Sequence, residues 1–137
     1  MGQGILFDKV IALKQTGGDP SGWHLPEWSL RQNEALMDSS STKTTIFSLT
    51  APEVPILRGT AATQLARHVS EYGATLRDSN PSRFGFFAAL PCLCDSIEAA
   101  LEEIRYSLDH LKAAGIILYT RYGPGNHYQG HADFLPI

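Results

Sequence analysis

The five histidines are the residues of this chain that could bind a metal ion or transfer a proton near neutral pH. They are His24, His68, His110, His127 and His131. His127 and His131 are four residues apart, a spacing that on a helix would present two ring nitrogens to one metal ion. The residues between them are typical of a loop, so the alternative is a pair of loop histidines that hold the backbone. His68 and His110 fall in predicted helices, and we expect both to face solvent.

Other polar and aromatic residues could bind a small acid. Arg121 ends a predicted strand and could hold a carboxylate through two hydrogen bonds, or form an ion pair across the end of the sheet. Trp23 and His24 lie on a long loop, where they could contact a planar ligand or anchor the loop. Asn126 could bind a ligand or serve the geometry of a Gly-Pro-Gly turn. With Thr50 at the end of another strand, these five are the candidate substrate-binding residues, and we assign no residue as catalytic or metal-binding.

Two further groups of reactive residues predict no site. Cys92 and Cys94 are separated by one residue, which is too close for an unstrained disulfide, and two cysteines are too few for a zinc site. We expect them to be reduced thiols. Glu98, Glu102 and Glu103 are typical of a charge cluster near a helix N-terminus rather than of an acid/base pair.

Helix signals recur along the chain. Apolar residues at helical spacing predict a short helix over residues 6–13, which a glycine pair ends. Ser29 and Gln32 form a capping-box signature for a second helix. A third helix is expected over residues 60–79, and a fourth begins at a capping box of Asp95 and Glu98 and ends at Gly115.

Strand signals alternate with these helices. Three β-branched, aromatic or apolar runs predict strands over residues 44–50, 84–90 and 116–121. Strand, helix, strand, helix, strand is the pattern of an α/β fold with a parallel sheet. The loops after the strands form the ligand site in such folds, so the positions after each predicted strand are the ones expected to meet a ligand.

Composition excludes several classes of protein. The 137 residues are enough for one domain, and 43% of them are apolar, which argues against a disordered chain. The formal net charge of −3 leaves no basic field for nucleic acid. No apolar run approaches the ~20 residues of a membrane span, and no secretory signal opens the chain, so we expect a cytoplasmic protein.

Four segments together resemble a known family. They are residues 17–23, 48–52, 81–91 and 119–128, of which PSRFGFFAALP at 81–91 is the most specific. They are similar to the amidohydrolase-related branch that contains 2-amino-3-carboxymuconate-6-semialdehyde decarboxylase and 6-methylsalicylate decarboxylase. The resemblance implies a (β/α)8 barrel that releases carbon dioxide from a small aromatic or enoic acid, or hydrolyses a related bond.

The same resemblance implies a divalent metal ion, with zinc expected. The family ligands are a His-x-His pair on the first strand with a histidine and an aspartate from later strands, which leave one position open for water or substrate. No two histidines of this chain are separated by a single residue. We therefore expect this chain to bind no metal ion itself.

The length of the chain also differs from that of a complete barrel. A full barrel takes about 250 residues, so residues 1–137 are expected to form a partial (β/α)8 barrel of about three parallel strands with flanking helices, equivalent to strands two to four. The chain then reads as an incomplete gene product, a truncated copy or a trimmed fragment. The inward strand face would lack its partners, so Ile46, Tyr119 and Phe87 would face solvent or another chain, which favours a homo-oligomer or marginal stability.

Two hypotheses for function follow. By resemblance, the chain derives from a metal-dependent decarboxylase or hydrolase of a small carboxylic acid and is expected to be inactive as given. Alternatively, it is a non-catalytic fragment that serves as an interaction module or binds a small acid.

Overall fold

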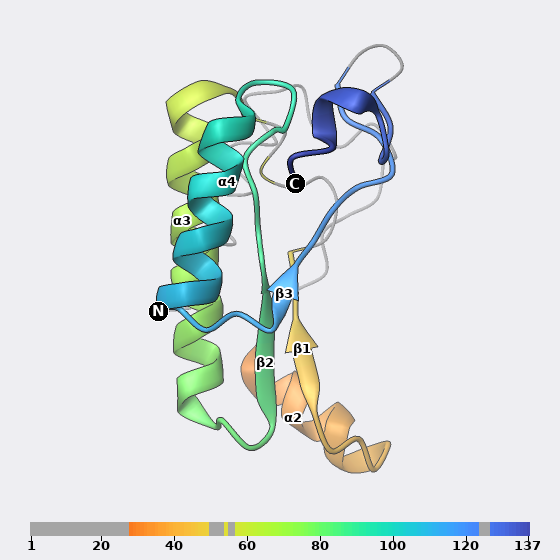
Figure 1. Cartoon of the computed structure of the whole chain (residues 1–137). Helices are drawn as coiled ribbons and strands as arrows, with labels where there is room; N and C mark the ends of the chain where they lie inside the picture. Colours follow the sequence, from red (N-terminus) through yellow and green to blue (C-terminus); the bar gives the residue numbers. More distant parts are fainter. Residues whose placement is uncertain (1–27, 50–53, 55–56, 124–126) are drawn as a thin grey trace.

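The computed structural model describes residues 28–49, 54, 57–123 and 127–137, and the predicted helix over residues 6–13 lies outside them. Helix and strand alternate along the described part of the chain, as the sequence predicts. The elements, numbered as in Figure 1, are α2 (Leu30–Ser39), β1 (Thr45–Phe47), α3 (Gly59–Ser79), β2 (Phe84–Ala88), α4 (Ile97–Arg105), a π-helical turn (Tyr106–His110), β3 (Gly115–Ile116) and a 3-10 helix (Ala132–Phe134).

The three strands form one parallel sheet in the order β1-β2-β3. Thr45 pairs with Phe84 and Phe47 with Phe86, while Ala88 pairs with Ile116. Helices α3 and α4 stand side by side along one face of this sheet (Figure 1). The prediction of an α/β fold with three parallel strands and flanking helices is therefore confirmed.

Each strand is shorter than predicted, and β3 differs most. It was expected over residues 116–121, but only Gly115 and Ile116 pair with β2. The expectation that Gly115 ends the preceding helix is also wrong. The helix ends in the π-helical turn, and Lys112 follows with a φ of 56°. Arg77 of α3 donates to the carbonyl oxygens of Leu111 and Lys112, so a side chain from another helix satisfies this end.

The helix starts show how local signals compete. Ser29 caps α2 as predicted, because its hydroxyl accepts from the Gln32 N–H at 3.2 Å. At α4 the predicted capping residue Asp95 is wrong by one position. Ser96 is the cap, and its hydroxyl accepts from the Ala99 N–H at 3.1 Å. Asp95 instead binds the start of α3, as described below.

Helix α3 approaches the sheet through small side chains. Its buried residues are mostly small, namely Ala62, Ala66, Ser70, Gly73 and Ala74. The helical spacing of Leu65, Val69, Tyr72 and Leu76 predicts one apolar face, of which Leu76 is buried and the other three are half-buried. A Cβ atom at Gly73 would lie 2.7 Å from Cδ2 of Phe86 on β2. The helix therefore packs on β2 at a distance that only glycine permits at this position.

The opposite face of the sheet is open in the described part of the chain. Ile46 and Phe87 remain 41% and 38% exposed, which confirms the prediction for these two residues. Tyr119 is half-buried and packs against the apolar cluster around Tyr122. Ile46 lies over Gly85, and Phe87 lies over Gly115, so each side chain leans across the neighbouring strand.

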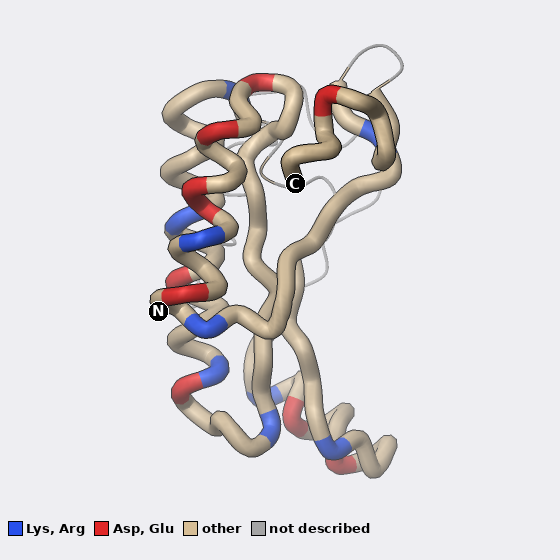
Figure 2. The backbone as a smooth tube through the Cα atoms, in the orientation of Figure 1, with Lys and Arg blue, Asp and Glu red and all other residues tan. Residues whose placement is uncertain are grey.

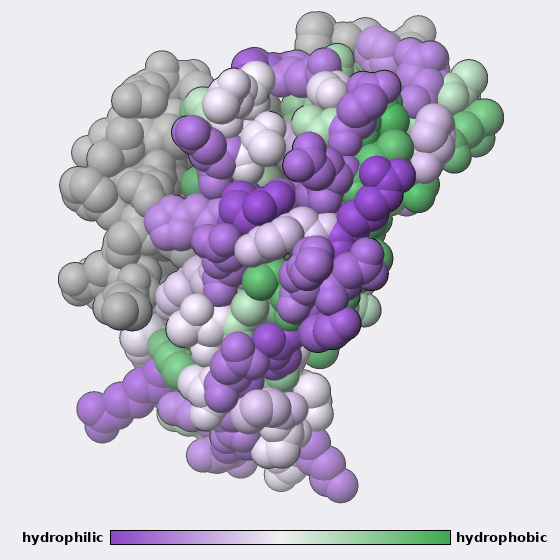
Figure 3. Space-filling view, turned by 60° about the vertical axis from the view of Figure 1, so that its left-hand side comes forward, coloured by the Kyte–Doolittle hydropathy of each residue, from purple (hydrophilic) through white to green (hydrophobic). Residues whose placement is uncertain are grey.

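The charged residues are also unevenly distributed between helices and strands. Acidic and basic residues gather on the helices, while the strands carry none (Figure 2). The side of the molecule on which α3 and α4 lie is mostly hydrophilic on its outer surface (Figure 3). Among the described residues, no helix combines the length and apolar character needed to cross a bilayer.

Candidate functional site

Most of the predicted binding residues fall outside the described part of the chain. Trp23, His24, Thr50 and Asn126 all lie there, so their candidate roles remain predictions. Arg121 is described and exposed, and its backbone forms an isolated antiparallel bridge with Tyr128. This bridge turns the chain back after β3 and sets Arg121 beyond the carboxyl end of the sheet.

Tyr122, the residue after Arg121, points into the core instead of toward a ligand. It is 4% exposed, and its hydroxyl accepts a hydrogen bond from the Tyr119 N–H at 2.9 Å. Its ring also packs edge-on against Phe134 with 5.4 Å between the ring centres. Tyr122 therefore anchors the segment that carries Arg121.

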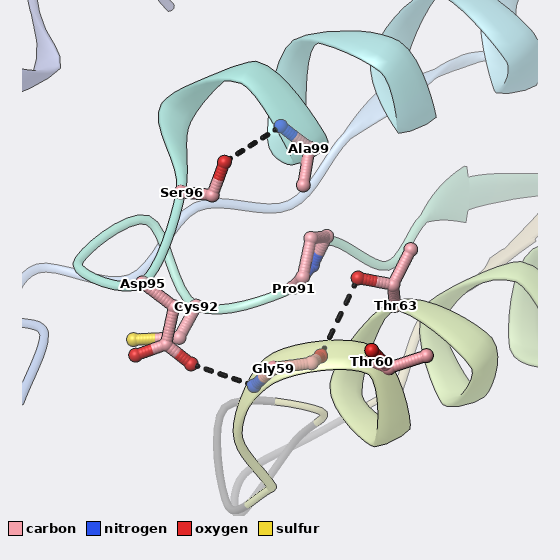
Figure 4. A pocket seen from close by; sticks show the side chains of 8 residues that line it. All are labelled: Gly59, Thr60, Thr63, Pro91, Cys92, Asp95, Ser96 and Ala99. Atoms are coloured by element: carbon pink, nitrogen blue, oxygen red, sulfur yellow. Dashed lines mark hydrogen bonds between the residues drawn. The ribbon is translucent and has the colours of Figure 1, made fainter.

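A hollow of about 330 Å³ lies between the N-terminal ends of α3 and α4 (Figure 4). Pro91 and Cys92, which follow β2, form one side of it. The remaining walls come from the first turns of the two helices, namely Gly59, Thr60, Thr63, Asp95, Ser96 and Ala99.

A charged clamp joins these two helix starts. Arg58 Nη1 donates to Asp95 Oδ1 at 2.9 Å and to Cys92 Sγ at 2.8 Å. The other carboxylate oxygen, Asp95 Oδ2, accepts from the Gly59 N–H at 3.1 Å. Burial works to lower the pKa of Arg58, but Cys92 and Asp95 outweigh it and raise that pKa, so the guanidinium stays charged.

Two free thiols lie beside the clamp. Cys92 and Cys94 are both free, as expected from their spacing. Burial raises the pKa of the Cys94 thiol, and Cys92 raises it further. A protonated thiol is a weak nucleophile, so Cys94 does not have the properties of a catalytic cysteine.

The occupied donors limit what the hollow can bind. A helix N-terminus attracts anions through its unpaired N–H groups. Here Asp95 takes the Gly59 N–H and Ser96 takes the Ala99 N–H (Figure 4). The clamp therefore serves structure, fixing the turn after β2 to the start of α3.

A second cluster of polar side chains lies after β3. One ligand atom each from His127, His131 and Asp133 lies within 4.8 Å of the others. Asp133 Oδ2 is 3.8 Å from His127 Nε2 and 3.5 Å from His131 Nδ1. The structure thus brings together the two loop histidines that the sequence singled out and adds a carboxylate.

Sequence reasoning missed Asp133, Arg58 and the role of Asp95. Asp133 is two residues beyond His131, and a short 3-10 helix brings its carboxylate back to the imidazoles. That helix spans only Ala132–Phe134, too short to give a periodic signal. Arg58 lies 37 positions before Asp95, and nothing in the local sequence marks such a contact.

The comparison with known sequences finds similar proteins that are named decarboxylases. No family model matches it. It is 54% identical over 132 residues to a protein named decarboxylase yanB from Aspergillus niger, covering 93% of this chain and 35% of that protein. It is 47% identical over 127 residues to the 6-methylsalicylic acid decarboxylase acuB of Aspergillus aculeatus, covering 92% of this chain and 38% of that enzyme. The chain thus spans little more than a third of the length of these relatives.

The fold of this chain is also similar to solved structures of amidohydrolases and decarboxylases. The fold matches an amidohydrolase II crystal structure with a TM-score of 0.80 and 27% identity, over 94% of this chain and 41% of that one. It also matches a dihydroxybenzoic acid decarboxylase from a Polaromonas species, described with bound manganese and the inhibitor 2-nitroresorcinol. That match has a TM-score of 0.70 and 26% identity, over 90% of this chain and 36% of the other. The resemblance to the amidohydrolase-related decarboxylases and the partial barrel are therefore confirmed.

The donor set that this resemblance implies for a metal does not occur in the chain. A His-x-His pair is absent from the full sequence. Among the described residues, the His, Cys, Asp and Glu side chains that group closely enough for a metal are the three after β3. These three follow one another within seven positions and do not lie at the ends of different strands. The described residues thus do not form the donor set of the family's metal site.

Proposed function

We propose that this chain is part of a metal-dependent decarboxylase that acts on a small aromatic carboxylic acid. Residues 1–137 would form one incomplete barrel domain, equivalent to strands two to four with their helices. The 54% identity to a fungal decarboxylase over 93% of the chain is the observation that carries this proposal. The structures matched at 26–27% identity include a dihydroxybenzoic acid decarboxylase, which supports a planar aromatic acid as substrate.

In this proposal the chain supplies part of the wall that holds the substrate. Arg121 lies past the end of β3, where parallel α/β folds bind their ligands, and a guanidinium can hold a carboxylate through two parallel hydrogen bonds. Trp23, His24, Thr50 and Asn126 would line the same wall. The role proposed for all five residues is to bind and orient the acid.

The metal ion would be held elsewhere. We infer that a divalent cation is bound by ligands that this chain lacks. The manganese in a matched structure supports a divalent cation, and the ion would be either zinc or manganese. When bound, such a cation supplies a Lewis acid for the carboxylate and neighbouring oxygen. The chain by itself is then expected not to release carbon dioxide.

A chimeric enzyme tests the proposal. The segment of the Aspergillus aculeatus enzyme that matches this chain is replaced by the corresponding residues of this chain, and carbon dioxide release from 6-methylsalicylic acid is measured. The chimera is expected to retain activity, because the grafted segment is 47% identical to the one it replaces. A chimera that folds, judged by circular dichroism and its unfolding curve, but releases no carbon dioxide would refute the proposed function.

The same chimera tests Arg121. Arg121→Gln should raise KM for the acid about tenfold or more, because a charge-assisted pair of hydrogen bonds is lost. Arg105→Gln is the matched control, since Arg105 is an exposed arginine on the last turn of α4. An unchanged KM in the Arg121 variant would remove this residue from the substrate wall.

A second candidate function is a non-catalytic module. The absence of the His-x-His pair from the sequence favours it. Such a module would cover its open sheet face, where Ile46 and Phe87 are exposed, with a second copy of the chain. Sedimentation of the isolated chain over a hundredfold range of concentration distinguishes the two: a concentration-dependent dimer supports the module, while a monomer at all concentrations opposes it.

A further inference from the structure

The cluster of His127, His131 and Asp133 has no part in the proposed substrate wall, yet its geometry is that of a ligand set. Two imidazoles and one carboxylate converge from a single short segment. Such a mixture of nitrogen and oxygen donors suits zinc and related first-row divalent ions. Magnesium and calcium prefer oxygen ligands throughout, so they fit this set poorly.

The distances from the carboxylate to the two imidazoles are close to those of a tetrahedral site. Bonds of 2.0–2.2 Å in a tetrahedral zinc site place neighbouring ligand atoms about 3.3–3.6 Å apart. Asp133 Oδ2 lies 3.5 Å from His131 Nδ1 and 3.8 Å from His127 Nε2. All three donor atoms lie within 4.8 Å of one another, so rotation of the side chains would bring them to bonding distance of one ion.

The hydrogen bonds around the rings show which nitrogens are unprotonated. His131 Nδ1 accepts from the Asp133 N–H at 3.3 Å, so it carries no proton, and a bound ion would take its lone pair in place of this long hydrogen bond. His127 Nδ1 is buried and has no hydrogen-bond partner among the described residues. His127 would bind the ion through Nε2, the nitrogen that lies 3.8 Å from Asp133, while Nδ1 keeps the ring proton.

The surroundings hold the two rings in place while leaving the third ligand accessible. The ring centres of His127 and His131 are 5.0 Å apart, and each lies 6.1 Å from that of Phe134, which is only 8% exposed. The Asp133 side chain is 64% exposed. A cation could thus enter from solvent, and a water molecule could complete its coordination.

We propose that His127, His131 and Asp133 bind one zinc ion, with water as the fourth ligand. The ion would close the segment from His127 to Phe134 against the core. This site differs from the metal centre that the resemblance implies, because its ligands come from one segment and not from the ends of several strands. It is also independent of the decarboxylase proposal.

Zinc binding to the purified 137-residue chain tests this inference. Equilibrium dialysis against zinc chloride, followed by elemental analysis, is expected to give one zinc per chain. Cobalt substituted at the same site should give the visible absorption of a four-coordinate ion. Asp133→Asn and His131→Gln should each weaken zinc binding at least tenfold, while His110→Gln, which removes an exposed histidine elsewhere, should change it less than twofold.

The outcomes separate the proposal from a loss of folding. Asp133 is largely exposed, so its Asn variant should unfold at the same denaturant concentration as the parent chain without zinc. Absence of bound zinc in the parent chain, or equal zinc affinity in the parent and in both ligand variants, would overturn the proposal.

Discussion

The two faces of the sheet differ although they share the same strands. On β2, Phe84, Phe86 and Ala88 point toward the helices and are at most 3% exposed. Phe87 lies between them in sequence, points the other way and is 38% exposed. Burial on the first face comes from α3 and α4, elements that this chain contains. The second face lacks such a cover in the described part of the chain, which is the arrangement expected of part of a barrel.

Truncating the aromatic residues of β2 should give the largest contrast between the faces. Phe86→Ala removes a fully buried ring and should lower the free energy of unfolding by about 3–5 kcal/mol. Phe87→Ala removes a ring that is already exposed in part and should cost about 1 kcal/mol or less. Urea unfolding followed by circular dichroism measures both. Equal losses would mean that the open face is covered in solution.

Adding one methyl group to each face should give a smaller contrast. Gly73→Ala places a Cβ 2.7 Å from the Phe86 ring, which is itself fixed in the core. The clash should exceed the gain in helix propensity and lower the free energy of unfolding by about 1–2 kcal/mol. Gly85→Ala is the matched control, because its Cβ meets only the end of the flexible Ile46 side chain. A stability loss for Gly85→Ala as large as that for Gly73→Ala would show that Ile46 is held rigidly.

On the covered side, Glu103 makes stability depend on pH. Burial raises the pKa of this carboxyl, although Arg67 at 2.9 Å and Ser107 lower it in part. Because the folded-state pKa is above the unfolded one, the stability from Glu103 is fully present below the unfolded pKa. It is lost as the pH rises through the folded pKa.

Glu103→Gln should remove that pH-dependent loss while keeping the size of the side chain. Unfolding free energies measured from about pH 4 to 7 should fall with pH less steeply in the variant than in the parent. Glu102→Gln, one position away and exposed, is the control and should follow the parent. Parallel curves for all three proteins would contradict the buried role of Glu103.

The smallest effect is expected for an exposed ion pair that belongs to neither face of the sheet. Asp38 accepts from Arg83 at 2.7 Å, but the Asp38 side chain is 68% exposed. Solvent-exposed ion pairs contribute about 0–1 kcal/mol. Asp38→Asn should therefore change the urea midpoint by little, and the change should shrink further in 1 M salt. If Asp38→Asn lowered the free energy of unfolding by more than about 2 kcal/mol, this pair would stabilise the fold more than an exposed ion pair normally does.

The sequence was sufficient for the class and order of elements but not for their ends. Alternating apolar runs and helical periods predict β1, α3, β2 and α4 because both signals are local. The end of α4 depends on a contact from α3, since Arg77 binds the carbonyls after the π-helical turn. Leu108 continues the helical spacing of Leu101 and Ile104, yet it is 38% exposed, because the wider turn shifts the residues after Arg105 out of register.

The candidate site could be anticipated only in part. The spacing of His127 and His131 was visible, but their convergence with Asp133 depends on a turn at Gly130, whose φ is 95°. The sequence predicts Asp95 as the cap of α4 because Glu98 follows it at capping-box spacing, but Ser96 also favours a helix start. Which of the two caps α4 was decided by Arg58, a residue distant in sequence.

The clamp of Arg58 and Asp95 limits how the loops of this fold can change in length. Loops after barrel strands usually tolerate insertions, since they lie at the surface. An insertion between Pro91 and Ser96 would withdraw one carboxylate from both the Arg58 guanidinium and the Gly59 N–H. Variation in loop length is therefore expected to be tolerated elsewhere, and the turn after β2 should keep a constant number of residues.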